Sequence, residues 1–271
     1  MRNISRKLLN APYIVWAALF IVIPMVIVIY YTFTDQNGAF TMSNLAAIAD
    51  YKDVMLRSFW YAIIATVICL VLAYPVAYCM SRMKPGAQRF VMMLIMLPMW
   101  MNLLIRTYSW TTILEKTGII NSFLGLFGIE PVTMIGTPGA VILGMVYNYL
   151  PYMILPIYTV MQKIDISLLE AAEDLGSNTI SKLRRVILPL SMPGVISGIT
   201  MVFVPSVSTF YISQKLGGLH TVMIGDIIQQ RFDKLSYNIG ASLSFVLMIV
   251  IFICMIVMNR FADDEDGGII V

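Results

Sequence analysis

Long runs without any charged residue dominate this chain and restrict the folds open to it. Five runs contain no Asp, Glu, Lys or Arg, and they cover residues 8–34, 58–81, 131–162, 186–214 and 235–259. A sixth run, 90–105, stops at Arg106 and resumes beyond it. A helix needs roughly 20 apolar residues to cross the hydrocarbon core of a bilayer. Charged residues make up 12% of the chain, against about 25% in ordinary globular domains. The sequence therefore predicts an all-α membrane protein with six transmembrane helices.

We expect one transmembrane domain that covers residues 1–271. Its spans should lie near residues 12–33, 58–80, 90–112, 138–161, 191–213 and 240–258. The first span has no small-residue cleavage site after it and is interpreted as a retained helix, not as a signal peptide. Prolines inside the spans predict kinked helices around a cavity, because membrane helices tolerate proline where neighbouring groups satisfy the freed backbone.

The distribution of basic residues predicts the orientation. If the N-terminus is cytoplasmic, the inner segments hold eleven of the 18 basic residues: Arg2, Arg6, Lys7, Arg82, Lys84, Arg89, Lys163, Lys182, Arg184, Arg185 and Arg260. Short cytoplasmic loops carry an excess of Lys and Arg. Both termini and the loop of residues 162–190 are therefore expected in the cytoplasm.

The 162–190 loop is the polar stretch with the most regular pattern. Ser167 precedes Glu170 by three residues, the spacing of a capping box, so a helix should begin at Ser167. Gly176 can end that helix in the left-handed conformation. A second helix should then begin near Ser177 or Asn178 and run through Lys182 to Pro189. The loop is thus predicted to fold as a helix, a glycine turn and a helix.

Several kinds of chemistry are missing from the sequence. It contains no G-x-x-x-x-G-K-[S/T], no H-E-x-x-H and no G-x-S-x-G, and its one histidine is His220. Nucleotide binding by a P-loop and hydrolysis by a metal or serine mechanism are therefore not expected in this chain. No Asp or Glu lies inside a predicted span, although ion-coupled carriers and pumps commonly use intramembrane carboxylates. The energy for transport should come from another subunit.

The spans offer aromatic rings and amides in place of carboxylates. We select as candidates for a substrate pathway Trp100, Asn102, Tyr108, Tyr147, Asn148 and Tyr211, together with Asp226 near the outer mouth. Aromatic faces attract ammonium groups, but packing and belt anchoring are competing interpretations. The two asparagines should face other helices or a wet cavity, because a lipid-facing amide is unfavourable. Arg106 is expected to snorkel to the outer interface or to pair with an outer carboxylate.

The loop also carries a spaced motif. It reads Glu170-Ala171-Ala172-x-x-x-Gly176, followed after nine residues by Val186-x-Leu188-Pro189. Lying between the fourth and fifth of six spans, this pattern resembles the signature of the permease subunits of bacterial binding-protein-dependent ABC importers, with Val186 in place of the more usual Ile. The resemblance implies the type I importer permease fold. It also implies that a cytoplasmic coupling helix docks on an ATPase through Glu170, Ala171, Ala172, Asp174 and Gly176.

Further stretches resemble one branch of that family, the first permease of spermidine/putrescine importers. They are residues 97–108, 169–176, 188–194 and 210–218. The resemblance implies a polyamine permease of the bacterial inner membrane that is not itself an enzyme and holds no cofactor, since ATP and Mg²⁺ are bound by the ATPase. Its implied partners are a second permease, two copies of the ATPase, an extracytoplasmic binding protein and membrane lipid, with no nucleic acid.

Two alternatives remain open. An ABC permease on the same plan could carry iron, an oxyanion, an opine or a sugar. A secondary carrier coupled to an ion gradient is a different class, which the lack of intramembrane carboxylates disfavours. Uptake by vesicles that lack the ATPase would distinguish that class from an ABC permease.

Overall fold

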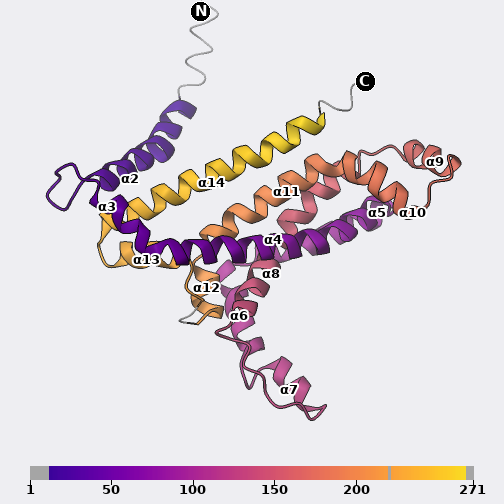
Figure 1. Cartoon of the computed structure of the whole chain (residues 1–271). Coiled ribbons are helices and arrows are strands. Elements are labelled where there is room, and N and C mark those ends of the chain that lie inside the picture. The colour runs from indigo at the N-terminus through magenta and orange to yellow at the C-terminus, as the bar shows by residue number, and fades with distance from the viewer. Residues whose placement is uncertain (1–11, 219–220, 267–271) are drawn as a thin grey trace, which may run out of the picture. The chain divides into compact units, whose positions relative to one another are not determined.

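The computed structural model describes residues 12–218 and 221–266 (Figure 1), which are helices and connecting loops with one isolated β-bridge between Thr34 and Phe40. By their contacts the described residues form two compact units, one of residues 12–53 and 227–251 and one of residues 54–218, 221–226 and 252–266. The prediction of a single domain over the whole chain stays a prediction, and the two units are described separately.

The helices follow one another along the whole described chain. In order they are a π-turn η1 (Ala18–Val22), α2 (Ile23–Phe33), α3 (Ser43–Ala46), a 3₁₀ turn η2 (Ala47–Tyr51), α4 (Lys52–Ser81), α5 (Pro85–Trp100), α6 (Leu103–Leu114), α7 (Ile119–Gly125), α8 (Pro138–Met161), α9 (Ile166–Asp174), α10 (Thr179–Lys182), a π-turn η3 (Leu183–Ile187), α11 (Leu188–Ser208), α12 (Tyr211–Leu216), α13 (Ile224–Asp233) and α14 (Tyr237–Asp266).

Five helical stretches are long and apolar enough to cross a membrane. They are Pro12–Phe33, Ser43–Ser81, Pro138–Met161, Thr179–Ser208 and Tyr237–Met258. A sixth span exists if Pro85–Trp100 and Leu103–Gly125, which are bent by 91° at their junction, are counted as one. The prediction of an all-α membrane protein is confirmed. The third span differs from the continuous helix expected over residues 90–112, because Met101 is extended and the Asn102 side chain accepts the Leu104 amide at 2.7 Å to begin a new helix.

In the larger unit, α8 and α11 share the most extensive interface between helices. Gly194 and Gly198 make this approach possible: a Cβ on Gly194 would lie 2.8 Å from the Pro156 carbonyl oxygen, and one on Gly198 would lie 2.7 Å from the Met153 sulfur. The G-x-x-x-G spacing thus serves close helix packing here. Small residues of α4, including Ala73 and Ala77, complete this core.

In the smaller unit, polar side chains tie the end of α2 to its neighbours. The Asn238 side chain at the start of α14 donates to the carbonyl oxygens of Tyr31 and Thr34 at 3.3 and 2.5 Å. The Asn44 amide donates to the carbonyl oxygens of Thr32 and Thr34. These bonds satisfy carbonyls that the last turn of a helix leaves without an intrahelical partner.

Candidate functional site

The loop between α8 and α11 forms a helix, a turn and a helix (Figure 1). Its first helix, α9, begins at Ile166, one residue earlier than the sequence suggested. Asp165 is the N-cap, and its carboxylate accepts the Ser167 amide at 3.0 Å. The amide and the hydroxyl of Ser167 lower the pKa of Asp165. The predicted capping box of Ser167 and Glu170 is therefore wrong, because Asp165, two residues before Ser167, is the N-cap instead.

The end of α9 follows the prediction for Gly176. Its φ is +79°, in the left-handed region. The Ser177 amide donates to the Ala172 carbonyl at 2.9 Å and the Gly176 amide donates to the Glu173 carbonyl at 2.8 Å. This pair of bonds is the Schellman motif, which satisfies the last carbonyls of a helix. The glycine turn is confirmed.

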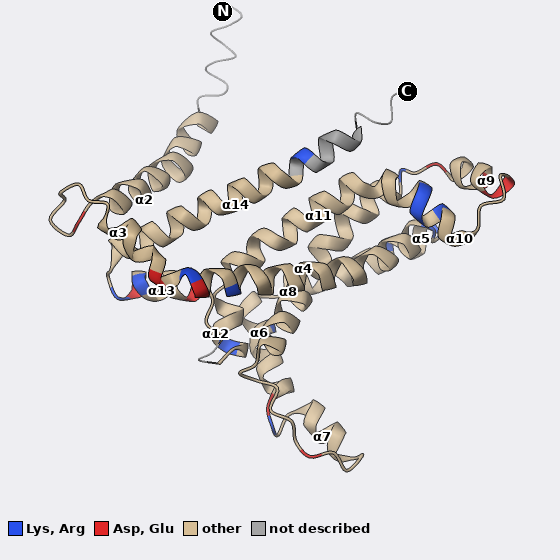
Figure 2. Ribbon diagram, viewed as in Figure 1, with Lys and Arg blue, Asp and Glu red and all other residues tan. Residues whose placement is uncertain are grey.

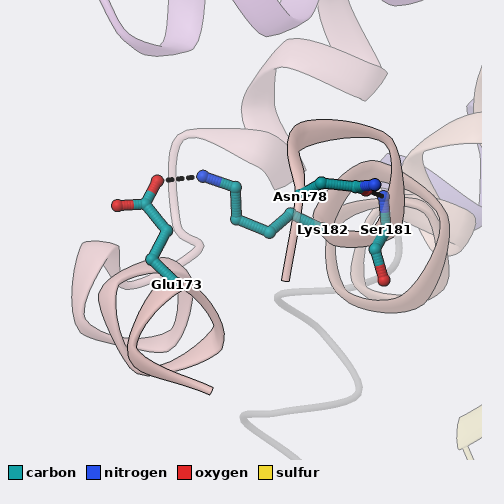
Figure 3. Close-up of polar contacts among 4 residues, drawn as sticks. All are labelled: Glu173, Asn178, Ser181 and Lys182. Carbon is teal, nitrogen blue, oxygen red and sulfur yellow. Dashed lines mark hydrogen bonds and ion pairs between the residues drawn. The ribbon is translucent and has the colours of Figure 1, made fainter. Parts of the chain in front are cut away.

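The second helix begins where it was expected. The Asn178 side chain caps α10 by accepting the Ser181 amide at 2.8 Å, and the helix continues through η3 into α11. Across the turn, Lys182 and Glu173 form an ion pair and hydrogen bond that joins α9 to α10 (Figure 3). The pair links the two helices across the glycine turn.

The helix α9 presents an accessible surface. Glu170, Ala171, Asp174 and Gly176 are exposed and Ala172 is half-buried. The surface also carries bare apolar side chains, with Leu175 at 87% exposed and Ile180 at 75%. Exposed large apolar groups beside acidic ones are typical of a protein-binding surface. The role of this surface in coupling stays a prediction.

At the other end of α11 the chain turns sharply (Figure 1). Thr209 is extended and ends α11, and the short helix α12 then packs on α6 and α8. Gly144 of α8 makes room for it, because a Cβ there would lie 2.4 Å from a Leu216 methyl group and 2.8 Å from one of Ile212. A broken helix between membrane spans is a frequent position for a substrate site in transporters.

Two predicted pathway residues meet at this break. Tyr108 of α6 and Tyr211 of α12 line one open groove of about 350 Å³, together with Leu104, Ile105, Ser109 and Thr112. The ammonium of Lys215 lies 5.9 Å from the centre of the Tyr211 ring. The Tyr211 face thus already holds a cationic group of this chain.

The other candidates have different surroundings. Trp100 is 77% exposed at the end of α5, and Asn102 caps α6. Tyr147 packs edge-on against Trp110 with ring centroids 5.3 Å apart. Asn148 is 1% exposed and donates to the Gly144 carbonyl at 2.8 Å, so it faces other helices as its amide chemistry suggested. Pathway roles for these four residues stay predictions.

Asp226 lies in the first turn of α13 and is 2% exposed. Its Oδ2 accepts the Met223 amide at 2.7 Å, the return bond of a capping box. The Ile224 amide donates to Ser58 Oγ of α4 at 2.7 Å. Burial raises the pKa of Asp226 to about 6, although the Met223 amide and the Ser213 and Gln214 side chains lower it in part. Its carboxylate thus closes a helix turn, and a substrate role for it stays a prediction.

Contrary to the expectation from the sequence, the Arg106 side chain does not reach the surface. It is 8% exposed, and its Nε and Nη1 atoms are buried without a hydrogen-bond acceptor among the described residues. The expectation that it snorkels or pairs with a carboxylate is therefore wrong, because its guanidinium group is enclosed by the packed helices and forms no ion pair with a described residue. His220 lies outside the described residues.

Helices that span a membrane, a break in one of them, and an exposed helix–turn–helix between two others define a membrane transport protein. The chain belongs to the family described as binding-protein-dependent transport system inner membrane component, whose model matches residues 70–263. It is a permease subunit and a multi-pass inner-membrane protein, and the nucleotide of such a transporter is bound by a separate ATPase subunit.

Relatives and solved structures agree with this assignment. The spermidine/putrescine transport system permease protein PotB of Escherichia coli is 36% identical over 256 residues, which cover 90% of this chain and 93% of PotB. A chain of a bacterial ABC transporter involved in the import of alginate has a TM-score of 0.79 at 17% identity and covers 97% of this chain and 98% of its own length. A second alginate transporter structure, in complex with a pentasaccharide-bound periplasmic protein, has a TM-score of 0.79 at 15% identity and covers 96% of this chain and 94% of its own. The predicted importer permease fold is confirmed.

Proposed function

We propose that this permease carries polyamines such as spermidine and putrescine. The observation that supports this most is the 36% identity to the E. coli spermidine/putrescine permease along 90% of the chain. The fold alone does not select this cargo, because a chain with the same fold serves alginate import. The substrate assignment therefore rests on sequence similarity and on the chemistry of the pathway.

The groove between α6 and α12 is the proposed binding site for an ammonium group of the substrate. Tyr108 offers an aromatic face and Ser109 and Thr112 offer hydroxyl oxygens, whereas the Tyr211 ring already lies beside the Lys215 ammonium, which a substrate cation would have to displace. No carboxylate lines this groove in the described part of the chain, so a polycation would bind weakly and leave easily. Weak binding suits passage, with selectivity set by the extracytoplasmic binding protein.

In this proposal, α9 transmits the motion of the ATPase to the permease. The exposed residues Glu170, Ala171, Asp174 and Gly176, with Ala172, form the surface that docks on the ATPase. Two ATPase copies, a second permease and a binding protein complete the complex. Both termini and the 162–190 loop lie in the cytoplasm, as the basic residues of the inner segments indicate.

The test is ATP-dependent uptake by the reconstituted complex, with spermidine, putrescine, ferric iron, a sugar and an opine compared at equal concentration. We expect spermidine or putrescine to enter and the others to be excluded, and uptake to stop without ATP. Uptake of a non-polyamine solute alone would contradict the polyamine assignment but not the assignment as an ABC permease. Uptake by vesicles that contain the permease pair without the ATPase would contradict the coupling role of α9.

A further inference from the structure

A cavity of about 300 Å³ lies between α9, α10 and the end of α4. Its charged lining consists of two basic residues, Arg82 and Lys182, and two acidic residues, Glu170 and Glu173. Because these charges balance, the cavity does not select a free anion or a free cation. The balance instead matches two internal ion pairs.

One of the two pairs already exists. Lys182 and Glu173 are bonded across the glycine turn (Figure 3), and the Lys182 side chain is 16% exposed. The other two charges, Arg82 and Glu170, line the same cavity without an ion pair in the described part of the chain. Glu170 is also free of the capping role that its spacing suggested, since Asp165 caps α9.

Arg82 is held in an unfavourable position. Its Nε and Nη2 atoms are buried and donate no hydrogen bond to any described residue. Its guanidinium carbon lies 5.8 Å from the centre of the Tyr78 ring. Such a contact offsets only part of the cost of leaving two buried donors of a half-buried guanidinium without acceptors. A carboxylate that reached Arg82 would therefore be strongly favoured.

We propose that Arg82 is the internal partner of Glu170, and that their ion pair forms when α9 moves toward the end of α4 and closes the cavity. This inference rests on the proposed role of α9 as the coupling helix. Arg82 directly follows the membrane-spanning stretch Ser43–Ser81. The pair would thus transmit a displacement of α9 to a span other than the two that flank the loop, making Arg82 a positioning residue for coupling.

A chemical cross-link tests the pair directly. In R82K the introduced amine keeps the positive charge, so the assembled complex should form and transport substrate. A carbodiimide joins an amine to a carboxylate only when they are in contact. We expect a cross-link between position 82 and Glu170 in the complex trapped with ATP and vanadate, and at least fivefold less in the nucleotide-free complex. The Lys182–Glu173 pair is the internal positive control. The proposal would be overturned if Lys182 and Glu173 were cross-linked while position 82 and Glu170 were not cross-linked in either state.

A double-mutant cycle supplies the functional readout, measured as substrate transported per ATP hydrolysed. R82Q and E170Q should each lower this ratio roughly tenfold, and the double variant should be no worse than either, because contacting residues are non-additive. The swap of R82E with E170R should restore much of the ratio. R89Q is the matched control, since Arg89 is exposed on α5 and bonds to its own helix at Pro85.

The cycle separates this inference from the proposed function. If E170Q transports like the wild type, both the coupling role of α9 and the pair are overturned. A different result would overturn the pair alone. In that case both single variants lower the substrate transported per ATP, their effects multiply in the double variant, and the R82E/E170R swap restores nothing. The helix α9 then remains the coupling helix without a pair to Arg82.

Discussion

Asp226 illustrates how a single buried carboxylate can be placed by helix chemistry. Its spacing of three residues after Met223 lets it accept the amide that begins α13. The adjacent Gly225 allows this turn to press on the end of α11, since a Cβ there would lie 2.5 Å from the Thr209 carbonyl oxygen. The acidic side chain that the sequence placed near the outer mouth is thereby buried.

The raised pKa of Asp226, about 6, predicts a pH-dependent stability. The unfolded chain releases this proton near its ordinary pKa of roughly 4. Between these values the folded state binds more protons, so the free energy of unfolding falls as pH rises through the window and stays lower above pH 6. Asp226→Asn removes the ionisation and keeps an oxygen for the Met223 amide. We expect it to stabilise the protein at pH 7.5, relative to the wild type, by on the order of 1 kcal/mol more than at pH 4.5.

Melting temperatures in detergent at the two pH values measure this difference. Asp233→Asn is the matched control, because Asp233 lies in the same helix and is exposed. A larger melting-temperature gain for Asp226→Asn at pH 4.5 than at pH 7.5 would contradict the assigned cause.

At the scale of the elements, the helix–turn–helix between α8 and α11 has one position whose backbone conformation favours glycine. Gly176 is left-handed, and a Cβ at Gly176 would meet nothing within 4 Å. A side chain there is therefore strained by roughly 1 to 2 kcal/mol in the backbone but points into the open space in front of α9. That space is where a docking subunit would approach.

Gly176→Leu should accordingly fold, reach the membrane and lose nearly all ATP-dependent uptake, because its side chain obstructs docking. Gly176→Asn separates the two effects, since asparagine accepts the left-handed conformation and is smaller and polar; we expect partial uptake. Membrane content by immunoblot and uptake in intact cells are the measurements. Unchanged uptake by the leucine variant would reduce the turn to a structural role.

Much of this element level could be predicted from the sequence, since charge-free runs, the glycine turn and the cap at Asn178 are local patterns. The features that sequence reasoning missed depend on distant neighbours. Ser58 caps α13 across 166 residues, and nothing local distinguishes it from other serines. The break after Met101 coincides with the Asn102 cap, and α12, which is distant in the chain, packs on the helix that begins there. The burial of Arg106 likewise depends on neighbours that are not local in sequence.

At the scale of the whole molecule, charge is confined mostly to the loops and helix ends, and the middles of the long helices carry almost none (Figure 2). Arg106 in α6 is a charged residue that lies away from the loops, and it is 8% exposed. In a transporter of this family the nucleotide is bound by a separate ATPase subunit. A subunit built in this way depends on a partner for energy, so the side of the membrane on which α9 lies decides where that partner must be.

The orientation follows from the basic residues and gives the last prediction. Two basic groups are predicted to mark the same side of the membrane: Arg82 and Lys84 between α4 and α5 with Arg89 in the first turns of α5, and Lys182, Arg184 and Arg185 after α9. Positive loops stay in the cytoplasm. A green fluorescent protein fused after Lys84 or Asn178 should fluoresce, and alkaline phosphatase fused at either point should be inactive. Alkaline phosphatase fused after Asn37 or Glu130 should be active, which controls for export. Activity of the phosphatase after Asn178 would place α9 outside the cell, away from ATP, and would remove the basis for coupling through this helix.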